Sequence, residues 1–142
     1  MANWQWKETR GLQLLVEAPL VLLCGGVTYY GLEMLWRGRS HWSMALCGAI
    51  CFYFIYRVNA MYPHTLLPVR ALYGALFITT VELIAGCWVN LRLGLNVWDY
   101  SNLPFHFMGQ ICLLYSLIWF LLCFPLSALC RLIRRRVFLS DV

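Results

Sequence analysis

Residues 108–136 read MGQICLLYSLIWFLLCFPLSALCRLIRRR, and this stretch decides the fold class. From Met108 to Cys130 it contains no charged residue, and the segment RLIRRR follows directly. An uncharged apolar run of this length can cross the hydrocarbon core of a bilayer as a helix. Arginines directly after such a helix are typical of its cytoplasmic end. The stretch therefore predicts a transmembrane helix that ends in the cytoplasm.

Three similar apolar runs precede it and are separated by polar connections. The first run extends from about residue 12 to Trp36, the second from Trp42 to Tyr56, and the third from Pro68 to about Leu91. Each run is continuously apolar rather than alternating, which favours helices over the strands of a membrane barrel. We therefore predict an all-α integral membrane protein with four transmembrane helices. It forms one domain over residues 1–142, built from two helical hairpins, 12–62 and 66–132.

The composition excludes a separate soluble domain. Hydrophobic residues make up 62% of the 142 residues and charged residues only 12%, about half of the roughly 25% typical of soluble domains. No GxxxxGK[ST] phosphate loop occurs, so the chain has no nucleotide-hydrolysing domain of that type. Its seven cysteines include no CxxC pair and are expected to be small residues of the membrane core.

The basic residues divide unequally between the two sides of the membrane. With four spans, both termini and the second connection share one side, which carries Lys7, Arg10, Arg57, Arg70, Arg131, Arg134, Arg135 and Arg136. The other side carries Arg37, Arg39 and Arg92. The positive-inside rule therefore predicts that both termini lie in the cytoplasm, and we expect the protein in the plasma (inner) membrane. The terminal arginines fit anionic lipid headgroups, and we expect no nucleic-acid partner.

The two predicted hairpins share a sequence pattern that indicates an internal repeat. An ungapped alignment matches Pro19 with Pro68, Leu23 with Leu72, Gly25 with Gly74 and Glu33 with Glu82. The second helices also agree, because GAIC at 48–51 parallels GQIC at 109–112. Each proline is expected in the first turn of its helix, where no backbone hydrogen bond is lost. Glu33 and Glu82 would then lie at the same depth, in the outer third of the membrane.

Glu33 and Glu82 are the candidate ion site. A carboxylate inside a membrane helix costs about 2.5 to 3.5 kcal/mol on insertion scales, so it needs a partner or a function. Glu33 has an ordinary explanation, since Arg37 follows it by four residues and can pair with it. Glu82 is followed only by LIAGCW, which offers no such partner. A functional role is therefore better supported for Glu82.

The connection at 91–107, LRLGLNVWDYSNLPFHF, holds the second group of candidate residues. It is much longer than the first connection, and long loops in compact chains are usually functional. One interpretation is a lid over a site; the other is an interfacial aromatic belt in which Asp99 caps a turn. His41 lies on the same side of the membrane. The binding or ion-site candidates are Glu82, Glu33, Asp99, Trp98, Tyr100, Ser101, His106 and Gly109.

These motifs resemble those of a known family. Glu82-Leu-Ile-Ala-Gly86, Val97-Trp-Asp-Tyr-Ser101, Pro104 and Gly109-Gln-Ile-Cys112, with Ser116 and Trp119 beyond, are similar to the ABC-transporter type IV family of CmpB-like permeases and to vertebrate transmembrane protein 229. The resemblance covers about residues 66–125. It implies a four-span architecture and marks Glu82, Trp98, Asp99, Tyr100, Ser101 and Gly109 as motif positions.

Three functions remain open at this stage. The first is a small permease or channel, acting as a homo-oligomer, in which Glu33 and Glu82 bind a proton or a cation. The second is an intramembrane enzyme acting on a lipid, with Glu82, Asp99 and His106 as base or as ligands of a divalent metal. The third is a non-catalytic subunit of a larger membrane complex. No cofactor motif is identified, a transport role is favoured over an enzyme, and membrane lipids are expected partners.

Overall fold

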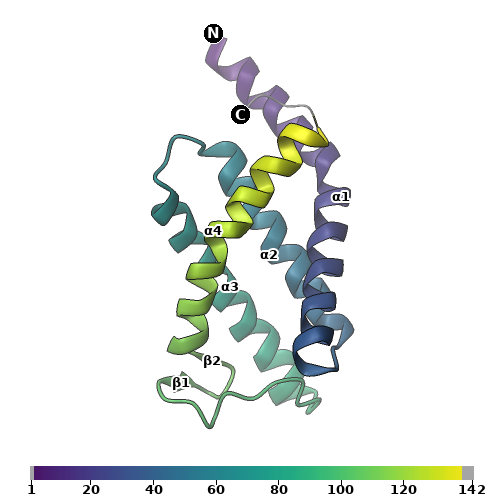
Figure 1. Cartoon of the computed structure of the whole chain (residues 1–142), viewed down its shortest axis with the longest axis vertical. Helices are drawn as coiled ribbons and strands as arrows, with labels where there is room; N and C mark the ends of the chain where they lie inside the picture. The colour runs from purple at the N-terminus through teal and green to yellow at the C-terminus, as the bar shows by residue number, and fades with distance from the viewer. Residues whose placement is uncertain (1, 139–142) are drawn as a thin grey trace.

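The computed structural model describes residues 2–138, with side chains from Leu12 to Phe138. Four long helices run through it: α1 (Ala2–Arg37), α2 (Trp42–Met61), α3 (Leu67–Gly86) and α4 (Leu113–Arg136) (Figure 1). Helix α3 continues as the π-helix η1 (Cys87–Arg92). The following loop contains two short antiparallel strands, β1 (His106–Phe107) and β2 (Ile111–Cys112). The prediction of an all-α fold is confirmed.

The four helices have the length and composition of membrane spans. The candidate spans are Leu12–Arg37, Trp42–Met61, Leu67–Arg92 and Leu113–Arg136, and between 17% and 44% of each apolar window is buried inside the protein. Most of each helix surface is therefore apolar and faces outward, as expected for helices surrounded by lipid rather than by water.

Helix α1 begins and helix α4 ends at the same end of the bundle, which we call the terminal end (Figure 1). The loop between η1 and α4 covers the opposite end, which we call the loop end. Helix α1 packs along α2 and α3 packs along α4, while α2 also contacts α3 and α4. Each of these two pairs of packed helices is consecutive in the chain.

Two boundaries differ from the sequence prediction. Pro19 lies inside α1 rather than in its first turn, because the helix already begins at Ala2, whereas Pro68 does lie at the start of α3. Prolines are tolerated inside membrane helices, where neighbouring groups satisfy the freed carbonyl. Helix α4 begins at Leu113 rather than at Met108, because Met108 and Gly109 have positive φ and the next residues form β2.

The repeat is matched at some positions and not at others. Gly25 of α1 lies against Phe52 of α2, and Gly74 of α3 lies against Cys123 of α4, so each glycine contacts the second helix of its own hairpin, although Phe52 and Cys123 are not aligned positions of the repeat. Gly48, in contrast, lies inside a helix, while its counterpart Gly109 lies in a loop with φ of 68°. The duplication therefore stays a prediction.

Candidate functional site

Glu82 lies at the centre of the site. Its side chain projects from α3 toward the loop and α4, and the residue is 7% exposed. One carboxylate oxygen, Oε1, accepts a hydrogen bond from the hydroxyl of Tyr100 at 3.2 Å, and Oε2 accepts one from Nε1 of Trp119 at 2.9 Å. Both donors are neutral. Among residues 12–138, no lysine, arginine or histidine forms an ion pair with Glu82.

Glu82 lines a cavity of about 100 Å³ between the four helices. Trp98 from the loop also contributes to its wall, together with residues from each helix. The lining is Gly25, Thr28, Tyr29, Leu32, Met44, Cys47, Gly48, Cys51, Phe52, Ile55, Ile78, Val81, Glu82, Trp98, Trp119, Leu122, Leu126 and Leu129. Glu82 is the only aspartate, glutamate, lysine or arginine in this lining. The cavity is therefore an apolar chamber with one carboxylate in its wall.

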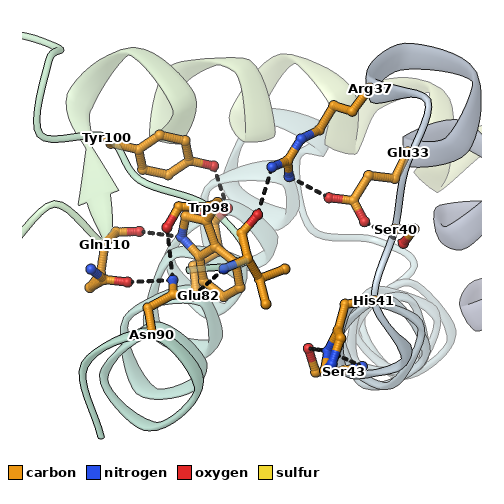
Figure 2. Close-up of polar contacts among 11 residues, drawn as sticks. Glu33, Arg37, Ser40, His41, Ser43, Glu82, Asn90, Trp98, Tyr100 and Gln110 are labelled. Carbon is orange, nitrogen blue, oxygen red and sulfur yellow. Dashed lines mark hydrogen bonds and ion pairs between the residues drawn. The ribbon is translucent and has the colours of Figure 1, made fainter. Parts of the chain in front are cut away.

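Glu33 occupies a different environment. Its carboxylate pairs with Arg37 at 2.7 Å and accepts a hydrogen bond from Ser40 Oγ at 2.5 Å (Figure 2). It lines a separate cleft of about 150 Å³ with Arg39, His41 and residues 95–97. Glu33 and Glu82 therefore share neither a hydrogen-bond donor nor a cavity.

The two glutamates are nevertheless linked through one loop segment. Arg37, held by Glu33, donates through its other terminal nitrogen to the backbone oxygen of Val97 at 2.6 Å (Figure 2). Three residues later, Tyr100 donates to Glu82. Burial raises the pKa of Tyr100 above its ordinary value, and the charge of Glu82 raises it further. The phenol therefore remains protonated and keeps its role as a donor.

A buried polar network holds the loop against the bundle. Asn90 Nδ2 donates to the backbone oxygen of Trp98 at 2.9 Å and to Gln110 Oε1 at 2.8 Å (Figure 2). Asn90 Oδ1 accepts from the backbone N–H of Val97 at 2.7 Å. Trp98 Nε1 donates to the backbone oxygen of Gln110 at 3.0 Å. Trp98, Asn90 and Gln110 are all buried, so this network anchors the loop to the loop end of the bundle.

Gly86 makes room for this network. A Cβ placed on Gly86 would lie 2.5 Å from Gln110 Oε1 and 2.9 Å from Gln110 Cβ. The spacing Glu82-x-x-x-Gly86 thus places a carboxylate facing the cavity and, one turn later, a gap that accepts Gln110. Sequence reasoning missed Asn90 altogether, because a single asparagine near the end of an apolar run carries no distinctive pattern.

The remaining loop candidates lie outside the cavity. Asp99 accepts hydrogen bonds from the backbone N–H and the hydroxyl of Ser101, both at 2.8 Å. The hydrogen bond from the backbone N–H of Ser101 lowers the pKa of Asp99 most, and the hydrogen bond from the Ser101 hydroxyl and the charge of nearby His106 lower it further. His106 Nδ1 accepts from the N–H of Gly109 at 3.2 Å. Asp99 therefore forms a local turn, as one of the two interpretations of this loop expected.

Among the described residues, these candidates do not form a set of metal ligands. Among residues 12–138, no group of three or more histidine, cysteine, aspartate or glutamate side chains has an arrangement that could hold a metal ion. Glu82 is bonded to Tyr100 and Trp119 rather than grouped with Asp99 and His106. His41 bonds the side chain and the N–H of Ser43, at the start of α2. The three-ligand arrangement considered from the sequence is not formed.

Gly109 has a clear structural requirement. Its φ is 68°, and a Cβ there would lie 2.8 Å from Asp99 Oδ1. We expect Gly109→Ala to displace Asp99 and to loosen the turn, because alanine is both strained at this φ and too large for the space. Limited proteolysis of the loop should therefore become faster than in the wild type. Gly94→Ala is the control, since Gly94 also has positive φ but a Cβ there would have no neighbouring atom within 4 Å. Equal cleavage rates for the two variants would contradict the packing explanation.

Sequence reasoning also missed a second polar cluster, at the terminal end. The hydroxyl of Tyr56 donates to Glu17 inside the bundle. Nearby in the chain, Asn59 donates to Ser127 Oγ at 3.1 Å and accepts from Arg70 at 2.9 Å. All five residues are at most 7% exposed. They tie α1 to α2, and α2 to α3 and α4.

Comparison with known proteins identifies the family. A family model described as "Putative ABC-transporter type IV" matches residues 30–140. The chain belongs to this family. The match includes the end of α1 and all of α2, and so extends beyond the region 66–125 that the motifs alone indicated. Comparisons with curated proteins and with solved structures gave no match.

The family assignment and the fold both indicate a membrane protein. Four apolar helices in an ABC-transporter type IV chain indicate a membrane protein of transporter type. The motif positions divide into two groups in the structure. Glu82 and Trp98 face the cavity and Tyr100 supports Glu82, whereas Asp99, Ser101 and Gly109 shape the turn beside them.

Proposed function

We propose that this protein is a small permease or channel in which Glu82 binds a proton or a small cation. The observation that carries the proposal is the carboxylate of Glu82, which faces an apolar cavity with two neutral hydrogen-bond donors and no cationic partner among the described residues. An ionised carboxylate in such surroundings is costly. A bound proton or cation removes that cost, so the site favours occupancy by one of them.

Glu33 has a different role in this proposal. Its charge is already balanced by Arg37, and Arg37 holds the backbone of Val97. Glu33 therefore positions the loop over the cavity, while Glu82 alone is the transport site. The greater number of arginines at the terminal end supports a cytoplasmic location for both termini, so that Glu82 lies nearer the outer face.

Flux measurements test the role of Glu82. Purified protein in liposomes with a proton gradient, or with a gradient of K⁺ or a small organic cation, should collapse one of these gradients. Glu82→Gln keeps the shape of the side chain and removes its charge, so flux should fall to the level of protein-free liposomes. Glu33→Gln is the comparison variant and should lower flux only in part, because it weakens the contact that Arg37 makes with Val97 but leaves the cavity carboxylate in place.

Two outcomes would overturn the proposal. One is an absence of any flux from folded wild-type protein, and the other is full flux in Glu82→Gln. A stable complex with a larger membrane protein, combined with no flux, would instead favour a non-catalytic subunit. The exposed loop side chains Phe105, Phe107 and Met108 offer a surface for such a partner.

A further inference from the structure

A groove on the outer face of α2 and α3 lies apart from the Glu82 cavity. It has a volume of about 360 Å³ and is lined by Ile50, Tyr53, Phe54, Arg57, Val58, Met61, Tyr62 and Phe77. The rings of Phe54 and Phe77 stack with centroids 3.8 Å apart and connect the two helices along it. All lining residues other than Arg57 are uncharged. The groove is therefore apolar and carries one positive charge, that of Arg57.

Arg57 lacks a good hydrogen-bond acceptor. One terminal nitrogen donates to the hydroxyl of Tyr53 at 3.1 Å, and the other faces the sulfur of Met61 at 3.6 Å. The Nε atom is buried and has no hydrogen-bond partner. No carboxylate among the described residues pairs with Arg57. A guanidinium group has five N–H donors and suits a phosphate or a carboxylate, while a thioether is a weak acceptor.

The position of Arg57 fits the geometry of a phospholipid. Arg57 lies one turn before α2 ends at Met61, at the terminal end of the bundle, and Ile50 lies about 10 Å deeper at the helical rise of 1.5 Å per residue. A headgroup at Arg57 would therefore place its acyl chain along Phe54 and Ile50 toward the bilayer centre. Basic pockets at the cytoplasmic ends of transmembrane helices bind anionic headgroups in this way.

We propose that this groove binds one anionic phospholipid, with its phosphate on Arg57 and an acyl chain along Ile50, Phe54 and Phe77. The charge of Arg57 selects anionic lipid, and the apolar lining supplies affinity for the chain. This site is independent of Glu82 and does not require transport.

Native mass spectrometry of the full chain in detergent tests the proposal. The protein is titrated with phosphatidylglycerol or with phosphatidylcholine carrying the same acyl chains. The wild type should prefer phosphatidylglycerol about fivefold, the ratio that corresponds to about 1 kcal/mol for one arginine near anionic lipid. Arg57→Gln should bind both lipids equally. Arg92→Gln is the control and should keep the preference, because Arg92 lies over Trp88 at the loop end.

Two further experiments distinguish the contribution of the acyl chain from that of the headgroup. Ile50→Trp fills the groove and should weaken binding of both lipids alike. Glycerol phosphate, which has a phosphate and no acyl chain, should not displace bound phosphatidylglycerol. The proposal is overturned if the wild type shows no preference, if Arg57→Gln keeps it, if glycerol phosphate competes as well as the lipid, or if a second copy of the chain occupies the groove. A circular dichroism spectrum that matches the wild type confirms that each variant is folded.

Discussion

Replacing Gly48 with leucine is expected to destabilise the pairing of α1 with α2 strongly. Even a Cβ on Gly48 would overlap with Cβ of Tyr29 and would lie 2.8 Å from its Cγ. The Cβ of Tyr29 is fixed to the backbone of α1, so no change of rotamer can relieve the contact and the two helices must separate. Small residues at helix contacts are the main device that lets membrane helices pack closely.

The expected loss for Gly48→Leu is at least the roughly 1 to 3 kcal/mol typical of overpacking. Unfolding in mixed micelles of increasing SDS content, followed by circular dichroism, measures it. Gly31→Leu is the matched control on α1, because a Cβ at Gly31 has no atom within 4 Å. It should unfold at the wild-type SDS fraction. Equal losses in both variants would show that the added leucine side chain destabilises either helix, and that the contact with Tyr29 is not the cause.

The sequence predicts the helices well because the membrane imposes strong and local rules. Length, apolarity and the distribution of arginine are read directly from the chain, and four spans follow from them. The prediction for Pro19 is wrong because a proline at the start of a helix and a proline inside a membrane helix look alike in one sequence. The predicted start of α4 is wrong because Ile111 and Cys112 are apolar whether they form a strand or a helix.

The site can be predicted only in part, because its partners come from distant segments. Glu82 is identifiable from the sequence as a membrane carboxylate without a neighbouring cation. Its donors, Tyr100 and Trp119, are 18 and 37 positions away, and only the folding of the loop onto α3 and α4 brings them together. The pairing with Glu33 rests on an alignment alone. In the structure, Glu33 forms an ion pair with Arg37 instead, which the position of Arg37 four residues later in α1 allows.

Removing the indole of Trp98 is expected to have the largest effect on the loop. Trp98 is 5% exposed, lines the cavity beside Glu82 and donates through Nε1 to Gln110. Trp98→Ala leaves a cavity and removes this bond, so unfolding should become easier by about 3 to 5 kcal/mol. Because its backbone oxygen also accepts from Asn90, movement of this residue loosens the network that positions Tyr100 on Glu82.

Two variants separate the contributions of the ring and of its N–H group. Trp98→Phe keeps an aromatic ring but loses the N–H donor and part of the ring volume, so its stability should fall between wild type and Trp98→Ala. Phe105→Ala is the control, because Phe105 is an aromatic of the same loop that is 81% exposed. SDS unfolding should leave Phe105→Ala close to the wild type. If Trp98→Ala unfolds at the same SDS fraction as Phe105→Ala, then Trp98 does not anchor the loop, and Glu82 must be held in place by α3 and α4 alone.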